Sequence, residues 1–247
     1  MQIECPLFAN VFAYWDMKPL LAVLLLCLPL PAASIVTGGQ LLNQTNANQL
    51  AAWLGQGDLQ LTNVFSSAPV SGGSTAFHTA VDGIGPTFIL IQTNLGLVGG
   101  YDPISWSSPV NGGYTINLTN AGRTAFIYNL TTTTLFLQRP VPAGGFDAGQ
   151  YQAYNTNGYG PTFGGGHDLA VNSNNLGSGY SYSYSYGNGY QGVNLFGVAS
   201  PSQSNFNITR VEAFTFSSVA TTATPEPATF GLFGGALALL GMLRRRT

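Results

Sequence analysis

Short runs of β-branched and aromatic residues, separated by turns rich in Gly, Asn and Ser, follow one another from residue 87 to residue 216. The clearest run is 87–91, and apolar residues return at 95–98 after Thr93-Asn94, which predicts a β-hairpin. This pattern favours a mainly β protein, a two-sheet antiparallel β-sandwich with a few peripheral helices. Further strands are expected at 115–118, 124–130, 135–137, 169–172, 181–186, 194–198 and 208–216.

Two short helices are expected before these strands. Residues 48–54 form an amphipathic segment that ends at Gly55, a residue suited to the left-handed backbone of a helix C-terminus. Ser74 is expected to cap a second helix, which ends at 82–83.

The last of the predicted strands places two scarce charges beside bulky apolar groups. Because an unpaired buried charge is very costly, Arg210 and Glu212 are expected to be partly buried and paired, in a structural role. Alternation puts Ile208, Arg210, Glu212, Phe214 and Phe216 on one face of this strand.

The first 34 residues have the order of a secretory signal peptide. Lys18 precedes the apolar stretch 20–30, and the small-residue cleavage site Pro-Ala-Ala-Ser follows at 31–34. Acidic residues further upstream, and Met17 directly before Lys18, predict that translation starts at Met17. The apolar stretch is short for a stable membrane span, and an uncleaved anchor is the alternative.

The C-terminal end combines a proline-rich element, an apolar segment and an arginine cluster. As a helix, the sixteen uncharged residues 228–243 would extend about 24 Å at ~1.5 Å per residue, slightly less than the hydrocarbon core of a bilayer. The segment is expected to insert with the arginines on the cytoplasmic side, and a buried core helix is the alternative. The flanking residues are Pro225, Glu226 and Pro227 before the segment and Arg244, Arg245 and Arg246 after it.

These three features together resemble the PEP-CTERM sorting signal of Gram-negative, biofilm-forming bacteria. The resemblance implies that an exosortase-type enzyme recognises the Pro-Glu-Pro element, with Glu226 as a recognition residue, and processes the tail. It also implies a protein that is anchored in the inner membrane before processing and then reaches the cell surface or the extracellular matrix.

Charged residues make up only 6% of the chain. Between residues 34 and 224 there are three arginines and six carboxylates, so no basic patch is left to neutralise phosphates. Non-specific affinity for nucleic acids depends on such a patch, and we exclude nucleic-acid binding. Both cysteines, Cys5 and Cys27, precede the expected cleavage site, so the mature domain would have no thiol and no disulfide.

Four segments, in order, resemble the TLDc domain. They are 77–87, the Gly-Gly-Tyr at 99–101 with Trp106, the strand 125–128 and the glycine-rich stretch 160–169. A strand bearing Glu212 closes the similarity, which runs from about residue 53 to residue 216. The resemblance implies a sandwich of two antiparallel sheets with peripheral helices, no settled catalytic reaction, and a protective or protein-interacting role.

Each of the only two histidines has an aspartate nearby. Asp82 lies four residues after His78, and Asp168 directly follows His167; two imidazoles and a carboxylate could hold a metal or transfer protons. The structural alternative is that glycines 164–166 permit left-handed backbone and close packing, with His167 and Asp168 satisfying turn amides. We favour this alternative and assign no metal, no cofactor and no catalytic residue.

The segment 180–186 alternates tyrosine and serine, which puts four tyrosines on one face of an extended strand. Flat amphipathic rings such as those of Tyr182 and Tyr184 could stack on sugars, which makes these two residues candidate binding residues. Tyrosines also form half of many sandwich cores, and packing is the preferred interpretation.

The sequence therefore favours an exported, non-enzymatic interaction or structural protein of the extracellular matrix or biofilm. Its expected partners are an exosortase-type processing enzyme, the membrane through the C-terminal helix, and either exopolysaccharide or an envelope protein. The alternative is a metal-dependent or glycan-processing enzyme centred on His78, His167 and Asp168. The expected organisation is a signal region at 1–34, a TLDc-like β-sandwich at 38–220, a linker with the PEP element at 221–227 and the helical tail at 228–247.

Overall fold

The apolar run at 87–91 forms the first strand of a hairpin, as predicted. Strand β3 (Thr87–Thr93) pairs antiparallel with β4 (Gly96–Asp102). At the turn, the hydroxyl of Thr93 donates to the carbonyl of Gly96 and accepts from the amide of Leu95. The side chain of the first turn residue thus completes the short connection between the two strands.

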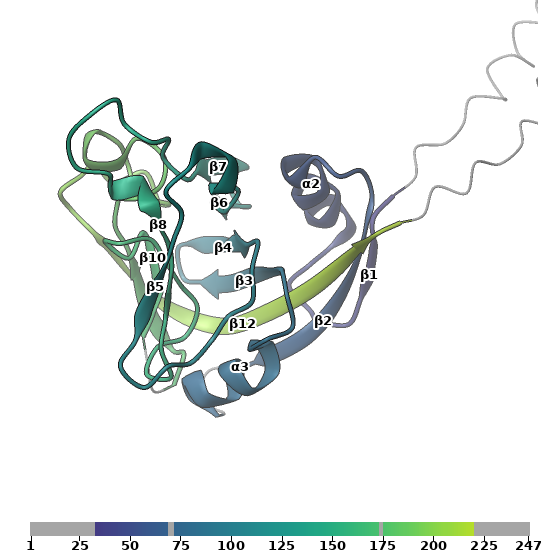
Figure 1. Cartoon of the computed structure of the whole chain (residues 1–247). Coiled ribbons are helices and arrows are strands. Elements are labelled where there is room, and N and C mark those ends of the chain that lie inside the picture. The colour runs from purple at the N-terminus through teal and green to yellow at the C-terminus, as the bar shows by residue number, and fades with distance from the viewer. Residues whose placement is uncertain (1–32, 69–71, 173–174, 220–247) are drawn as a thin grey trace, which may run out of the picture. The chain divides into compact units, whose positions relative to one another are not determined.

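The computed structural model of the chain describes residues 33–68, 72–172 and 175–219 (Figure 1). The predicted PEP element and helical tail lie outside these residues, as does nearly all of the predicted signal region. Among the residues described, no helix is long and apolar enough to cross a membrane.

The other elements are β1 (Ile35–Thr37), α2 (Gln44–Leu54), β2 (Leu59–Ser67), α3 (Gly73–Val81), β5 (Gly113–Ile116), β6 (Phe126–Asn129), β7 (Thr134–Leu137), β8 (Tyr151–Asn155), β9 (Thr162–Phe163), β10 (Leu169–Val171), β11 (Ser178–Ser181) and β12 (Ser204–Ser218), with short 3₁₀ helices at Asn120–Gly122, Ala148–Gln150 and Gly189–Gln191.

Hydrogen bonds join the strands in the order β5-β8-β9-β10-β11-β12-β3-β4-β6-β7, and β2 pairs with both β12 and β1. Of these strand pairs, only that of β1 with β2 is parallel. The prediction of a mainly β, antiparallel fold with few helices is confirmed. The division into two sheets stays a prediction. β12 pairs with β11 and also with β2 and β3, so hydrogen bonds join all these strands into one continuous sheet.

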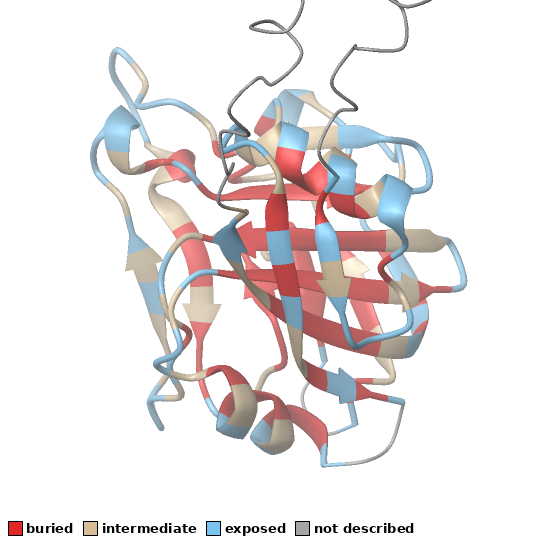
Figure 2. Ribbon diagram, turned by 90° about the vertical axis from the view of Figure 1, so that its right-hand side faces the viewer, coloured by how far each residue is buried: buried red, intermediate tan, exposed pale blue. Residues whose placement is uncertain are grey.

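Two apolar clusters lie on opposite faces of the central strands, whose residues are mostly buried (Figure 2). Ile89 and Ile91 of β3 belong to the first cluster, together with Phe163 of β9. Phe88 and Leu90 belong to the second, which α2 covers. Successive residues of β3 thus point to opposite faces, and burial on both faces explains why this strand is a continuous apolar run.

Strand β12 is longer than predicted and departs from strict alternation. Ile208, Val211 and Ala213 belong to the first cluster, whereas Phe214 belongs to the second. The register of β12 is irregular between Ile208 and Arg210 and again between Ala213 and Phe214. Such irregularities shift the faces of a strand, so the prediction that Ile208 and Phe214 share a face is wrong.

Glu212 of β12 is paired, as predicted, but it is fully rather than partly buried, whereas Arg210 is partly buried. Its carboxylate accepts hydrogen bonds from the backbone amides of Gln40 at 2.8 Å and Leu41 at 3.0 Å, and the Arg210 guanidinium lies 3.8 Å away. A Cβ on Gly39 would lie 2.7 Å from a carboxylate oxygen of Glu212, so only glycine fits there. Glu212 therefore fastens the segment before α2 to β12.

The two helices differ from the predictions mainly at their starts. Helix α2 ends at the left-handed Gly55, as predicted, but begins earlier, where the Asn43 side chain caps it. Helix α3 is preceded by Gly72 and has no side-chain cap, so the prediction that Ser74 caps it is wrong. Ser74 lies inside the helix, and its hydroxyl donates to the carbonyl of Asn157 at 2.8 Å.

One predicted strand is absent, another overlaps an observed strand at a single residue, and four strands were not predicted. The strand expected at 181–186 is present only as the end of β11. Residues 195–198 form a turn around Asn194, whose side-chain oxygen accepts from the amides of Phe196 and Val198, so this apolar run does not pair as a strand. The strands that were missed are β1, β2, β8 and β9.

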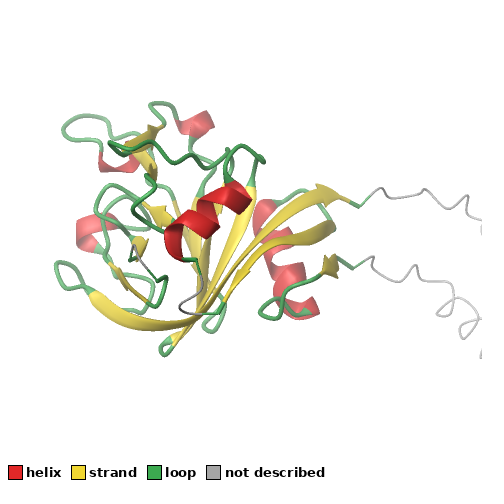
Figure 3. Cartoon of the chain, turned by 90° about the horizontal axis from the view of Figure 1, so that it is seen from below, coloured by secondary structure: helices red, strands yellow, loops and turns green. Residues whose placement is uncertain are grey.

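Both ends of the described domain lie on the same side (Figures 1 and 3). β1 pairs with β2, and the amide of Val219 donates to the carbonyl of Asp58 just before β2. At the other end of β12, Ser204 pairs with Ser181 of β11. The 15 residues of β12 would span about 45 Å at ~3.3 Å per residue, so β11 and its neighbours are remote from Val219.

Candidate functional site

The glycine-rich stretch singled out in the sequence forms the tight connection between β9 and β10. The amide of His167 donates to the carbonyl of Gly164, and both residues have left-handed backbone, with φ of 57° and 85°. His tolerates this conformation better than most residues, and Gly adopts it freely. A Cβ on Gly164 would overlap the carboxylate of Asp168, which gives a second reason for glycine at this position.

Asp168 is a buried structural clamp. Its carboxylate accepts hydrogen bonds from the backbone amides of Tyr184 at 2.7 Å, Ser185 at 2.9 Å and Tyr186 at 3.0 Å. Burial raises the pKa of Asp168 to about 6, although the hydrogen bonds from these amides oppose the rise. The clamp bends segment 184–186 toward β10, which explains why the predicted strand 181–186 ends early.

The His167 side chain, by contrast, faces tyrosines. Its Nδ1 lies 2.8 Å from the hydroxyl of Tyr180, and its Nε2 lies 3.4 Å from the hydroxyl of Tyr114. The rings of Tyr154 and Tyr159 pack against it at centroid distances of 5.4 and 5.7 Å. Burial lowers the pKa of His167, so the neutral imidazole is favoured at neutral pH.

This histidine and its tyrosines belong to a larger group of rings, which we call the aromatic surface. Successive rings in the group have centroids 4.8–6.5 Å apart, and each residue is half-buried or exposed. The most exposed are Phe146 at 64%, Tyr190 at 54% and Tyr114 at 37%. In order of contact, the members are Tyr182, Tyr190, Tyr184, Phe146, Tyr151, Tyr114, Tyr154, Tyr159, His167 and Tyr180.

Gly165 and Gly166 lie beneath the middle of the aromatic surface. A Cβ on Gly165 would be 2.5 Å from the ring of Tyr151, and one on Gly166 would be 2.6 Å from Cβ of Tyr184. The amide of Gly165 donates to the Ser185 hydroxyl at 2.8 Å. Tyr151 and Tyr184 therefore pack directly against the backbone of these two glycines. This agrees with the close packing that the sequence predicted for the glycine-rich stretch.

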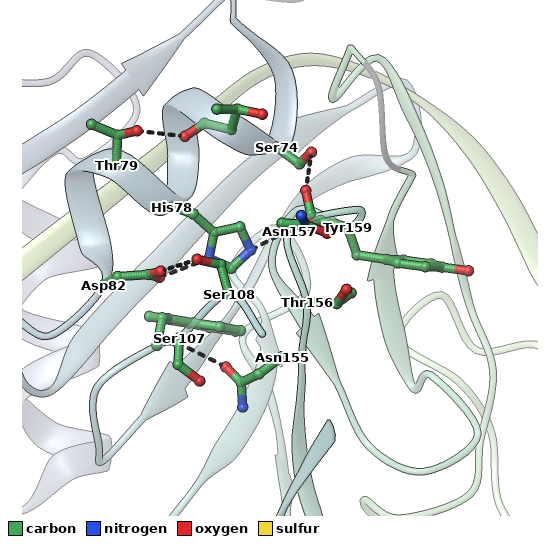
Figure 4. Close-up of polar contacts among 12 residues, drawn as sticks. Ser74, His78, Thr79, Asp82, Ser107, Ser108, Asn155, Thr156, Asn157 and Tyr159 are labelled. Atoms are coloured by element: carbon green, nitrogen blue, oxygen red, sulfur yellow. Dashed lines mark hydrogen bonds and ion pairs between the residues drawn. The ribbon is translucent and has the colours of Figure 1, made fainter. Parts of the chain in front are cut away.

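The other histidine lies in an internal polar cluster (Figure 4). Nδ1 of His78 is 2.7 Å from the carboxylate of Asp82, whose second oxygen accepts from the hydroxyl of Ser108 at 2.6 Å. Nε2 of His78 is 3.1 Å from the carbonyl of Tyr159. The cluster ties α3 to the loops that precede β5 and follow β8, and both ring nitrogens face acceptors of the protein itself.

The structure does not bring the four His and Asp candidates into one site. Tyr159 separates the histidines, since its carbonyl contacts His78 while its ring packs on His167. Within residues 33–68, 72–172 and 175–219, no group of three His, Cys, Asp or Glu side chains could hold a metal ion. Asp168 points into the fold, away from the face on which the His167 ring lies.

Tyr182 and Tyr184 are half-buried members of the aromatic surface. The alternating serines 181, 183 and 185 point inward and are buried. Tyr186 is also buried, and its hydroxyl donates to the carbonyl of Gln152 at 2.7 Å, so the prediction of four tyrosines on one face is wrong for this residue. The bend imposed by Asp168 turns Tyr186 into the core.

Sequence reasoning missed the members of the aromatic surface that come from other segments. Tyr114 lies on β5, Tyr151 and Tyr154 lie on β8, Phe146 lies in the loop before β8, and Tyr190 lies in the 3₁₀ helix Gly189–Gln191. No local pattern joins them. The available signal was the composition of the whole chain, which has 12 tyrosines and only 6% charged residues. The predicted strand at 180–186 accounts for only four of these tyrosines.

Comparison with protein families gives two matches. The TLDc domain matches residues 35–217, and the PEP-CTERM protein-sorting motif matches residues 223–246. The sorting motif marks an exported protein that an exosortase-type enzyme recognises, first anchored in the membrane and then released or displayed. A comparison with curated proteins finds no significant match.

Proposed function

The chain belongs to the TLDc domain family, and on that premise we propose that it is a non-enzymatic interaction domain of the extracellular matrix, delivered there by its sorting tail. The observation that carries this proposal is that ionisable side chains are used inside the fold, whereas aromatic side chains face outward. The ionisable groups Asp168, Glu212 and His78 are used inside the fold, where they fasten loops. The outward-facing group is the aromatic surface, which suits binding more than bond cleavage.

The competing proposal is a metal-dependent or glycan-processing enzyme centred on His78, His167 and Asp168. It requires these groups to converge on a substrate. His78 has both ring nitrogens directed at protein acceptors, and Asp168 is buried beneath the aromatic surface. This geometry favours the binding domain over the enzyme.

The test of the proposed function is the location of the full-length protein in its host. The chain is followed by antibody in cytoplasmic, membrane and matrix fractions, for the wild type, Glu226→Ala and Thr224→Ala. Glu226→Ala removes the acidic residue of the Pro-Glu-Pro element, whereas Thr224→Ala changes a neighbour just outside it.

We expect the wild type and Thr224→Ala to accumulate in the matrix as a shortened form. Glu226→Ala is expected to stay in the membrane fraction at full length. A wild-type chain that is released into the medium without associating with the matrix would contradict the proposal, whatever its processing.

A further inference from the structure

We propose that the aromatic surface binds a neutral polysaccharide chain, with His167 and its neighbouring tyrosines as one binding segment and Tyr184 with Tyr190 as another. This inference rests on the proposed function and names the partner class. It differs from the strand of tyrosines expected from the sequence, since most of the surface comes from outside residues 180–186.

The chemistry of the rings matches a sugar. A pyranose presents a face of polarised C–H groups, which packs on the negative face of an aromatic ring, and an edge of hydroxyls that seek hydrogen bonds. Tyrosine supplies both a flat ring and a hydroxyl. Around His167, the hydroxyls of Tyr114 and Tyr180 and the carbonyl of Gly165 lie together, because Tyr114 contacts both His167 and Gly165.

The size of the surface indicates a polymer. From Tyr190 to Tyr180 the rings follow one another across five separate parts of the chain: β5, the loop with Phe146, β8, and the segments 159–167 and 180–190. Gly165 and Gly166 lie beneath the middle of the group, where side chains larger than hydrogen would displace Tyr151 and Tyr184. One sugar ring would cover only one or two of these aromatic rings, so a chain of linked sugars uses the surface best.

The charge of the surface indicates a neutral ligand. Within the part of the chain that is described, no hydrogen bond or ion pair joins Tyr114, Tyr154 or Tyr180 to a carboxylate, lysine or arginine. Burial lowers the pKa of His167, so the neutral imidazole is favoured at neutral pH. Arg139 donates to the carbonyl of Tyr184 at 3.2 Å, at the margin of the surface. A polyanion would find no cluster of cations here.

The position of the surface suits a domain held by its C-terminal end. Tyr180 of β11 pairs with Asn205 at the start of β12, and Val219 follows the far end of the same strand. Figure 1 shows β5, β8 and β10 at the opposite side of the domain from β1. The surface therefore lies at the end of β12 that is remote from residue 219.

The experiment measures binding of the full chain, purified in detergent, to immobilised polysaccharides. The probes are a neutral glucan, a neutral galactomannan, the neutral polysaccharide fraction of the host matrix, and alginate as a polyanion. The variants are Tyr114→Ala and Tyr190→Ala, with Ile116→Ala as the matched control. Ile116 is 51% exposed and lies on the same strand as Tyr114, but has no ring and lies outside the aromatic surface.

We expect saturable binding to at least one neutral probe and none to alginate. Each tyrosine variant should weaken that binding about three- to tenfold, the range expected for one aromatic contact, and Ile116→Ala should leave it unchanged. Circular dichroism of each variant shows whether it is folded, and both tyrosines are exposed enough for replacement to be tolerated.

Three outcomes overturn the inference: binding to none of the neutral probes, binding to alginate alone, or neutral binding that both tyrosine variants retain in full. Different results decide the proposed function and the present inference. A chain that resides in the matrix but binds no neutral polysaccharide keeps that function with a protein partner, whereas a chain that binds polysaccharide but never reaches the matrix loses it.

Discussion

Gly166 lies directly beneath Tyr184, so that a Cβ on the glycine would be 2.6 Å from Cβ of the tyrosine. Such a contact is shorter than real structures allow, and the atom it meets is close to backbone that the Asp168 clamp holds in place. The glycine triplet thus serves the packing of the tyrosines above it.

Gly166→Ala is therefore expected to destabilise the domain. Forcing a methyl group into a close-packed site costs about 1–3 kcal/mol, and the free energy of unfolding should fall by that amount in urea denaturation. Gly144→Ala is the control, because its Cβ would meet nothing within 4 Å. Equal stabilities of the two variants would contradict the packing role of Gly166.

His78→Ala should destabilise the domain more than Ser108→Ala. The first change leaves the Asp82 carboxylate and the Tyr159 carbonyl without their buried partner, which costs about 2–4 kcal/mol. The second removes one hydrogen bond to Asp82, worth about 1 kcal/mol. Chemical denaturation measures both, and the reverse order would show that His78 is not the central member of its cluster.

The pH dependence of stability should report Asp102. Burial raises the pKa of this carboxyl group from 3.8 to about 7, and its Oδ2 has no hydrogen-bond partner among the described residues. The folded state therefore holds a proton that the unfolded state releases near pH 4, so stability falls as pH rises from about 4 to about 7 and levels off above.

Asp102→Asn should remove this part of the pH dependence. The raised pKa of Asp168 also makes stability fall with rising pH, but this contribution ends near pH 6. The effect of Asp102 is therefore clearest between pH 6 and 7.5, where the wild type should lose stability and Asp102→Asn should not. Asp58→Asn, at a position on the turn before β2, should follow the wild type. Parallel curves for all three proteins would show that Asp102 is ionised throughout.

Glu212→Gln should loosen the segment before α2. The amides of Gln40 and Leu41 would lose charge-assisted hydrogen bonds, and their hydrogen exchange should accelerate at least about tenfold. Arg210→Gln should have a small effect, because its guanidinium is partly exposed and lies 3.8 Å from Glu212. Unchanged protection of both amides in Glu212→Gln would contradict the fastening role.

Local patterns predicted the parts of the fold that local physics decides. The β3–β4 hairpin follows from a continuous apolar run and a turn, and the end of α2 follows from the left-handed Gly55. Residues 195–198 and 182–186 have equally good strand patterns but do not form strands. Their backbone amides are taken by Asn194 and Asp168, through contacts that no window of sequence contains.

The candidate site shows the same limit. His167, Tyr182 and Tyr184 were identified from their neighbours in sequence, and each lies in the aromatic surface. The pairing of His167 with His78 in one site was an open alternative that Tyr159 prevents. Tyr114 and Tyr151 join the surface because β5 pairs with β8, a long-range pairing that alternation alone does not specify.

We propose that the aromatic surface holds this exported domain in the extracellular matrix. The most direct measurement is the fraction of the protein retained in the host matrix after washing, for the wild type, the double variant Tyr114→Ala/Tyr190→Ala, and Ile116→Ala. We predict that the double variant is exported and processed normally but is washed out, while Ile116→Ala is retained like the wild type. Full retention of a folded double variant would contradict the account.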